Sequence, residues 1–402
     1  MRKLPIYVHI MLCCIYEISY SAEKTILLIV GTRPDIIKMA PIYHALKKTA
    51  INTVVCSTDQ HTDLAHDLFD LFQIHPDIHL HVMQPNQDLL HITTTVLNKL
   101  KELYRAVRPD LVIVQGDTTS AMSAALAAFY AHIPVAHVEA GLRTHNMQSP
   151  FPEELNRQMI SMVASYHFAP TQRAAEHLLN EGIDPSIIFV TGNTVVDALH
   201  WILEQIAAKN IAQSPSLHSM IQTLSTEYKH SALFTAHRRE SLNHGLEIIF
   251  KTLQEFLEQH PEVCIIYPMH PNPLIHHIFH QSGLSRLKNL IQLPPLSYID
   301  LIYTLCNVTC VITDSGGLQE EAASLGKYTV VLREITERTE SIDAGLSILT
   351  GYDPILIKTA LEHALEDSTL HRTLHNVALY GDGTAGVTIT QTLITHMLNN
   401  DV

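Results

Sequence analysis

Short runs of apolar, often β-branched residues alternate with helical patterns along most of the chain. In the first half the expected strands are residues 25–30, 52–56, 111–114, 134–138, 166–169 and 187–191. The helical patterns between them include residues 36–48, 62–72 and 119–131. A strand followed repeatedly by a helix is typical of βαβ units, which form a parallel sheet with helices on both faces. The pattern therefore predicts an α/β fold.

A second series of the same units begins after Gly192, where an expected strand ends in Thr-Gly-Asn. Its expected strands are residues 233–236, 264–269, 308–313 and 329–332. We therefore predict two Rossmann-like, doubly wound domains over residues 24–192 and 193–379. Ligands of open α/β sheets bind at the carboxyl ends of the strands, so the cleft between the two domains is the expected site.

The first 23 residues partly resemble a signal peptide. A basic start precedes an apolar stretch over residues 4–16, but His9 and Glu17 interrupt the pattern, and the stretch is too short to span a bilayer. We interpret residues 1–23 as an extension, or as a mis-set start, ahead of a domain that begins at Lys24. A secretory signal is the alternative.

Composition and charge narrow the classes of function. Of 402 residues, 46% are hydrophobic and 16% charged, which favours a globular protein over a disordered one. With a net charge of −14, the chain lacks the excess of basic residues that binding to nucleic acids or anionic membranes requires. A phosphate-bearing ligand must then be held by a few placed cations and backbone N–H groups. Six cysteines without a CxxC pair indicate reduced thiols and a cytoplasmic protein.

Neither a metal nor a dinucleotide cofactor is expected. Among the 27 histidines, the group at positions 276, 277 and 280 lacks the ligand spacing of zinc sites. The GDGTAG string at residues 381–386 follows no expected strand and opens no βαβ unit, so it does not predict NAD binding.

Glycines and charged residues follow several expected strands directly. The DSGG string at residues 314–317 opens a helix that carries Glu321, so its backbone N–H groups suit a pyrophosphate and the carboxylate suits the hydroxyls of a ribose. Arg33 and Lys38 follow the first strand and are expected near the cleft, although a plain βα turn explains that string equally well.

Acidic groups gather in the first half and basic groups in the second. The first half contributes Asp117, Glu139 and Glu153, and the second contributes the cluster at residues 237–239 and His270. A lone carboxylate at a strand end is usually a helix cap or an ion pair. Three of them facing a cationic cluster favour acid–base chemistry beside a bound anion.

Taken together, these strings resemble the UDP-N-acetylglucosamine 2-epimerase family. The matching strings, in family order over about residues 24–385, are GTRPDIIKMAPI, QGDTTSA, HVEAGLRT, SPFPEELNR, VTGNTVVDAL, AHRRES, HPNP, TDSGGLQEEAASLG and REITERTE. The resemblance implies a GT-B-like fold whose last segment, residues 380–402, returns to the first domain. It also implies a homodimer that interconverts UDP-GlcNAc and UDP-ManNAc without a cofactor.

The resemblance further implies roles for individual residues. The expected acid–base groups are Asp117, Glu139 and Glu153, with His237 beside the diphosphate. The other groups expected to contact the UDP-sugar are Arg33, Lys38, Arg143, Arg238, His270, Ser315, Gly316, Gly317, Glu321 and Arg338. Candidate allosteric residues, by analogy with members that bind a second UDP-GlcNAc, are Gln60, His61 and Gln87. Departures from the family pattern are Asp35, Asp59, Asn86, Ser241, Ala323, Thr339 and the Val387-Thr388 pair.

The chemistry of the sugar favours an elimination mechanism. The C2 proton of a nucleotide sugar is not acidic, because C1 is an acetal carbon rather than a carbonyl. An enzyme can oxidise C3 with NAD or eliminate the nucleotide, and the sequence lacks an NAD motif. In the family's mechanism UDP leaves to give 2-acetamidoglucal and then adds back. The alternatives are a hydrolysing epimerase, an epimerase of a modified UDP-sugar, a GT-B glycosyltransferase and a binding protein without turnover.

Overall fold

The computed structural model describes residues 24–60, 66–84, 87–238, 245–366 and 378–399. The expected extension over residues 1–23 lies outside the described residues, as do His61 and Ser241.

The first sheet has seven strands in the order β3-β2-β1-β4-β5-β6-β7, and every neighbouring pair is parallel. Its strands are β1 Thr25–Val30, β2 Asn52–Ser57, β3 Ile78–His79, β4 Leu111–Gln115, β5 Val135–Val138, β6 Tyr166–Ala169 and β7 Ile188–Val190. Its helices are α1 Arg33–Leu46, α2 His66–Leu71, α3 Leu89–Val107, α4 Thr119–Tyr130, α5 Glu153–Val163 and α6 Gln172–Asn180. All five residues of β4 are buried, as expected of a parallel strand covered on both faces.

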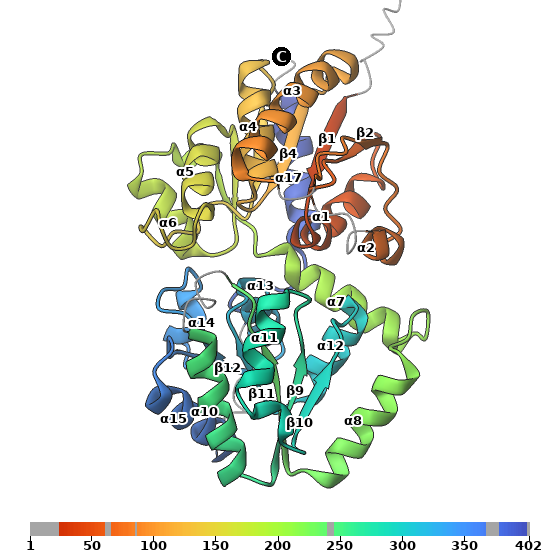
Figure 1. Ribbon diagram of the computed structural model, residues 1–402. Coiled ribbons are helices and arrows are strands. Elements are labelled where there is room, and N and C mark those ends of the chain that lie inside the picture. Colours follow the sequence, from red (N-terminus) through yellow and green to blue (C-terminus); the bar gives the residue numbers. More distant parts are fainter. Residues whose placement is uncertain (1–23, 61–65, 85–86, 239–244, 367–377, 400–402) are drawn as a thin grey trace, which may run out of the picture.

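The second sheet has six parallel strands in the order β10-β9-β8-β11-β12-β13. Its strands are β8 His230–Thr235, β9 Val263–Pro268, β10 Leu290–Leu293, β11 Cys310–Thr313, β12 Tyr328–Val331 and β13 Ser347–Leu349. Helices after the first sheet are α7 Thr194–Ala207, α8 Pro215–Glu227, α10 Gly245–Gln259, α11 Pro273–Gln281, α12 Tyr298–Asn307, α13 Gly316–Ser324, α14 Thr339–Asp343, α15 Pro354–Glu366 and α17 Ala385–Asn399. Figure 1 shows the two sheets with their helices as an upper and a lower half. The predicted α/β fold with two Rossmann-like, GT-B-like domains is confirmed.

The chain passes between the halves at two points that touch each other. The backbone N–H of Asn193, at the start of α7, donates to the carbonyl of Tyr380 at 2.6 Å. Gly192 and Gly381 have φ angles of 86° and 111°, and a Cβ at Gly192 would lie 3.0 Å from the Cα of Gly381. Helix α17 then packs against α1 in the upper half (Figure 1). We propose domain limits of 24–192 and 193–379 because the first crossing falls between them.

No helix within the described ranges is both long and apolar enough to cross a membrane.

Candidate active site

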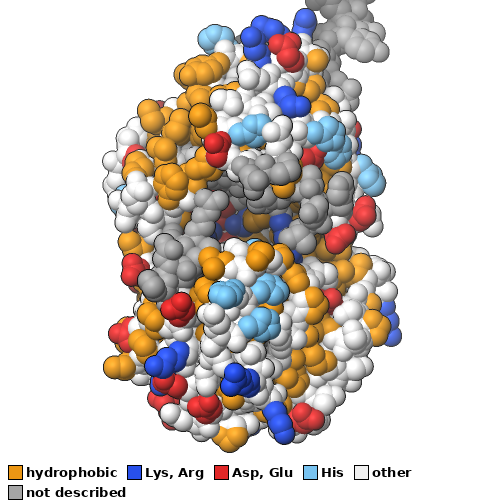
Figure 2. Space-filling model, viewed as in Figure 1, with side chains coloured by type: hydrophobic (Ala, Val, Ile, Leu, Met, Phe, Trp, Pro, Cys, Tyr) orange, Lys and Arg blue, Asp and Glu red, His pale blue; other side chains and the backbone are white. Residues whose placement is uncertain are grey.

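Residues that follow strands of one sheet contact residues that follow strands of the other. Glu139, after β5, contacts Arg338, after β12, so the carboxyl ends of the two sheets face the same space. We call this space the cleft; Asp117 and Glu139 border it from the first domain, and Ser315 and Arg338 from the second. Figure 2 shows the surface hollowed between the two halves, with Lys and Arg side chains inside the hollow.

Glu139 accepts hydrogen bonds from four different parts of the chain. Lys38 and Asn193 donate to its Oε1 at 2.5 and 2.9 Å, and Gln115 donates to its Oε2 at 2.5 Å. Arg338 contacts the same Oε1 at 3.4 Å from the second domain. Burial by itself would raise the pKa of Glu139, but the charges of Lys38 and Arg338 and these hydrogen bonds lower it to about 2. Glu139 is therefore an ionised carboxylate held in one place.

The backbone at Glu139 is also unusual. Its φ of 65° lies in the left-handed region, which residues other than glycine adopt rarely. Such a conformation persists only when the surroundings enforce it, and it occurs most often at functional sites.

Arg338 joins three buried carboxylates. Its guanidinium donates to Glu320 at 2.9 Å, to Glu337 and to Glu139. These surrounding charges outweigh burial and hold the pKa of Arg338 well above its usual range. A Cβ at Gly316 would lie 2.7 Å from the guanidinium carbon, so this position requires glycine while Arg338 lies over the start of α13. Lys38 also reaches Glu320, at 3.3 Å, so the Lys38–Glu320 pair crosses between the domains as the Arg338–Glu139 pair does.

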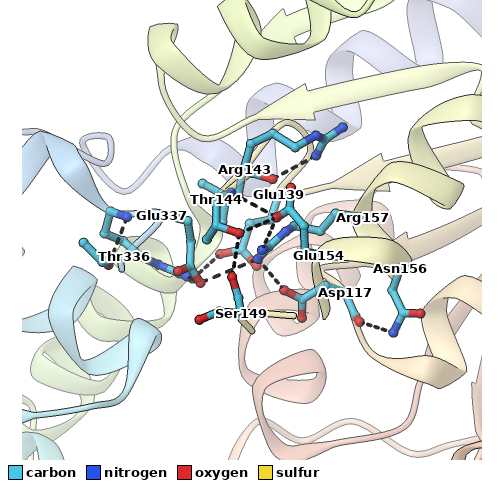
Figure 3. A network of polar contacts seen from close by, with 12 residues as sticks. Asp117, Glu139, Arg143, Thr144, Ser149, Glu154, Asn156, Arg157, Thr336 and Glu337 are labelled. Carbon is cyan, nitrogen blue, oxygen red and sulfur yellow. Dashed lines mark hydrogen bonds and ion pairs between the residues drawn. The ribbon is translucent and has the colours of Figure 1, made fainter. Parts of the chain in front are cut away.

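Arg157, on α5, links Asp117 to the second domain (Figure 3). Its guanidinium contacts Asp117 at 2.9 Å, Glu154 at 2.6 Å and Glu337 at 3.6 Å. Glu154 in turn accepts the backbone N–H groups of Thr144 and His145, which ties the loop after β5 to the start of α5. Glu154 thus supports the loops around the cleft, and its neighbour Glu153 remains available for chemistry.

Glu153 differs from the other carboxylates of the site. It is the first residue of α5, and its Oε2 is buried without a hydrogen-bond partner among the described residues. Burial and the nearby charge of Asp117 raise the pKa of Glu153, although a helix N-terminus favours the charged form. A carboxyl group with a raised pKa is suited to donate a proton.

The second domain presents polar groups from the loops that follow β8, β9 and β11. The backbone N–H groups of His237 and Arg238 both donate to Asp314 at 2.8 Å, which fixes the start of their loop. The rings of His237 and His270 stack with centroids 5.5 Å apart. Burial and the neighbouring His237 lower the pKa of His270. Ser315 makes no side-chain capping bond to α13.

Arg33 and Glu321 lie on opposite sides of the domain boundary, on α1 and α13. Tyr298 donates to the carboxylate of Glu321 at 2.7 Å. Burial, together with the neighbouring Glu320, raises the pKa of Glu321 to about 7. Burial lowers the pKa of Arg33, and the charge of Glu321 opposes that shift most strongly.

Arg143 contacts other parts of the chain in the structure, and its expected contact with substrate stays a prediction. Its side chain is fully buried, and its guanidinium donates hydrogen bonds to both carboxylate oxygens of Glu181, at 2.7 and 2.8 Å. Two further hydrogen bonds go to the carbonyl of Leu142 and the hydroxyl of Ser161. We therefore propose that Arg143 also has a structural role.

Two of the candidate allosteric residues lie together. Gln87 donates to the backbone carbonyl of Gln60 at 3.2 Å, and the Gln60 side chain accepts from Ser120 at 2.7 Å. Their third partner, His61, is outside the described residues. Asp59, beside them, has a φ of 55°, and its carboxylate accepts from Ser57 at 2.6 Å.

Several residues of the network were not singled out from the sequence. They are Gln115, Arg157, Asn193, Asp314, Glu320 and Glu337. All of them lie inside or next to strings that drew attention, such as QGD, TGN and DSGG. For Gln115, Asn193 and Asp314 the signal is a polar residue at or near a strand end, which does not by itself distinguish a site residue from a helix cap. Arg157 and Glu320 lie inside helices and carry no such signal.

Within the described part of the chain, no group of three or more His, Cys, Asp or Glu residues is arranged to hold a metal ion.

Known proteins resemble this chain over nearly its whole length. A family model described as UDP-N-acetylglucosamine 2-epimerase matches residues 44–394. A UDP-N-acetylglucosamine 2-epimerase of Yersinia pestis is 42% identical over 381 residues, which are 93% of this chain and 99% of that protein. An enzyme of the same description from Bacillus subtilis is 40% identical, over 92% of this chain and 95% of that protein.

Solved structures of proteins with the same description also resemble the fold of this chain. The UDP-GlcNAc 2-epimerase from Neisseria meningitidis, bound to UDP-GlcNAc, matches with a TM-score of 0.86 and 37% identity, covering 92% of this chain and 100% of that one. The Methanocaldococcus jannaschii enzyme in complex with UDP-GlcNAc and UDP matches with a TM-score of 0.80 and 32% identity, covering 92% and 99%.

Proposed function

Because the chain belongs to the UDP-N-acetylglucosamine 2-epimerase family, we propose that it interconverts UDP-GlcNAc and UDP-ManNAc with the nucleotide kept in the product. One observation carries the proposal beyond family membership. A carboxyl group with a raised pKa, Glu153, lies near a second carboxylate, Asp117, in a cleft that also contains Lys38 and Arg338. Such a site combines acid–base groups with cations for a leaving diphosphate.

The proposed reaction is an elimination followed by an addition. In the first step Asp117 takes the C2 proton, the C–H electrons form the C1=C2 double bond, and the C1–O electron pair leaves with UDP. In the second step UDP adds back to C1, and Glu153 delivers its proton to the opposite face of C2. After one turnover the two carboxyl groups have exchanged protonation states, and exchange with water restores them.

We propose that the diphosphate contacts cations and backbone N–H groups from both domains. Lys38 and Arg338 supply positive charge, and the amides at the start of α13 point their partial charge toward the same space. His237 and Arg238 lie at the neighbouring strand end, with their backbone held by Asp314. Glu139, whose pKa is about 2, holds Lys38 and Arg338 in position, a role we propose in place of direct proton transfer.

A single experiment separates this proposal from its alternatives. The purified protein is incubated with UDP-GlcNAc in D₂O, without acceptor, metal or NAD, and followed by NMR. We expect UDP-ManNAc that carries deuterium at C2. Free UDP together with free ManNAc would instead indicate the hydrolysing reaction, and UDP binding without conversion would redirect the search to acceptors of a glycosyltransferase.

The chemistry of the proposed product indicates how it is used. UDP-ManNAc retains its nucleotide and is an activated donor, so we propose that it supplies ManNAc units for surface polysaccharide synthesis. Cys56, Cys264 and Cys310 are free, buried thiols, which supports a reducing, cytoplasmic location.

We also propose that the protein forms a homodimer through the outer faces of α4 and α5. These helices pack side by side, and they expose Phe129, Tyr130, Leu155 and Met162, the last with 82% of its surface accessible. Figure 2 shows hydrophobic side chains gathered on the upper left, over the same helices. Contiguous apolar patches on a protein surface commonly mark interfaces.

A charge placed on this patch is expected to separate the dimer. The double variant Tyr130→Asp with Met162→Asp should elute as a monomer, as measured by size-exclusion chromatography with light scattering, because two carboxylates would have to be buried in the interface. Ile355→Asp is the matched control, because Ile355 is 75% exposed on α15, away from the patch. An unchanged dimer in the double variant, or a monomer in the wild type, would remove this assignment.

A further inference from the structure

Asn193 is buried at the first crossing between the domains and has two distinct hydrogen-bonding tasks. Its Oδ1 accepts from the backbone N–H of Val195 at 3.0 Å, which caps α7. This bond determines which way the amide faces, because the oxygen must point to the helix. The Nδ2 group must then point the other way, and it donates to Oε1 of Glu139 at 2.9 Å.

Asn193 lies where the two crossings between the domains touch. Its backbone N–H bonds to Tyr380, on the second crossing, and Gly192 beside it packs on Gly381. Two domains joined by such crossings are expected to move relative to each other, and a few residues between elements absorb the rotation. A rotation at residues 191–193 therefore displaces the Asn193 amide.

The Oε1 atom of Glu139 is contacted by Asn193 at the crossing and by residues of both domains. Lys38 approaches it from α1 of the first domain, and Arg338 approaches it from the second. Opening the domains would withdraw Arg338 and shift Asn193 at the same time. Closing them restores both donors to one oxygen atom.

We propose that Asn193 is a positioning residue that couples domain closure to the placement of the Glu139 carboxylate, and through it to Lys38 and Arg338. The inference rests on the proposed epimerisation for its kinetic consequence, but the contact itself is tested without substrate. Other titratable groups that face Glu139 are Glu320 on α13 and His137 on β5.

Three substitutions at this position separate the two tasks of Asn193. Asn193→Ser keeps a capping oxygen but has no donor that reaches Glu139. Asn193→Asp keeps the capping oxygen and replaces the donor with a carboxylate that repels Glu139. Asn193→Ala removes both the cap and the donor. Asn210→Asp is the control for the chemical change, because Asn210 is exposed beyond the end of α7.

In the kinetic experiment we expect Asn193→Ser to lower kcat about 10- to 100-fold with KM for UDP-GlcNAc nearly unchanged, because misplacing groups at the reacting centre slows the chemical step. Asn193→Asp should be slower still and should recover in part as the pH falls, because a protonated carboxyl group removes the repulsion and can donate to Glu139. If Asn193→Ser and Asn193→Asp both keep the wild-type kcat, Asn193 is only a helix cap and the proposal is wrong.

The second measurement is the melting temperature without substrate between pH 4 and 8. The pKa of Asp at position 193 would be raised by Glu139 and burial, so its folded form keeps the proton more tightly than its unfolded form. Asn193→Asp should therefore lose stability relative to Asn193→Ser as the pH rises, while Asn210→Asp should follow the wild type. Parallel melting curves for the first two variants would show that the contact with Glu139 is absent. If the variants melt as stated above but the wild type converts no UDP-GlcNAc, the proposed function is refuted and the contact between Asn193 and Glu139 still stands.

Discussion

Replacing Glu153 with glutamine is expected to lower kcat for epimerisation by about 10²- to 10⁴-fold, the usual contribution of one general acid. The substitution keeps the size and polarity of the side chain but removes its proton. Glu153 is suited to supply that proton because burial and the charge of Asp117 raise its pKa, and because its Oε2 has no hydrogen-bond partner among the described residues. The affinity for UDP should remain within a few-fold of the wild type.

The measurement combines steady-state kinetics with calorimetric titration of UDP, and Glu102→Gln on the exposed side of α3 is the control. The pH profile gives a second test. In the direction from UDP-GlcNAc to UDP-ManNAc the protonated form of Glu153 is required, so the wild-type rate should fall as the pH rises through its raised pKa. Glu153→Gln should lack this dependence. A variant with wild-type kcat would show that the proton comes from another group.

Replacing Arg338 with methionine is expected to lower the free energy of unfolding by about 3–5 kcal/mol, the usual cost of leaving buried charges without their partner. Arg338 is the shared cation of Glu139, Glu320 and Glu337, all of which are buried. Methionine fills similar space without charge, so the loss comes from electrostatics rather than from a cavity. The same variant should lose nearly all activity, because Arg338 also faces the proposed diphosphate.

Urea unfolding of the wild type and the variant measures this loss, with Arg105→Met as the control. Arg105 forms an exposed ion pair with Glu102, which is worth less than about 1 kcal/mol. Without Arg338 the folded-state pKa values of the three carboxyl groups rise, so the deficit should be largest at high pH. It should shrink as the pH falls through the raised values of the variant toward about 2, the pKa of Glu139 in the wild type. Adding Glu320→Gln should restore part of the stability. A deficit that is small, or that does not change with pH, would contradict the assignment of Arg338 as the central cation.

The sequence predicts the central strands and the edge strand β7, but not the other three edge strands. Strands such as β1 and β4 are continuous apolar runs because both of their faces are covered by helices. Strands β3, β10 and β13 were not expected from the pattern. They have two, four and three residues, lie at the edges of the sheets, and bury few of their side chains, so their apolar pattern is short and weak.

The position of Arg143 illustrates a second limit of the sequence. It follows Glu139 closely along the chain, in a string that suggested a contact with an anion. The structure adds a partner that the string does not reveal, Glu181, which lies 38 residues further along the chain. An arginine near a strand end gives the same sequence pattern whether it binds a ligand or pairs with a carboxylate of the protein, because the sequence does not show which group its side chain contacts.

The amino-acid sequence by itself determined the two parallel sheets, the strand ends at which the polar groups gather, and the family. These features follow from local periodicity and from motifs of neighbouring residues. Only the tertiary structure decided how the polar groups are paired and in which direction the pKa of each carboxyl group shifts. Glu139 meets Lys38, Asn193 and Arg338 across 101, 54 and 199 residues of chain, and its pKa is low because of them. For Glu153, burial and the nearby charge of Asp117 raise the pKa, and its Oε2 has no hydrogen-bond partner among the described residues. Burial and the distances between charges set this difference, and both arise only when distant segments pack together.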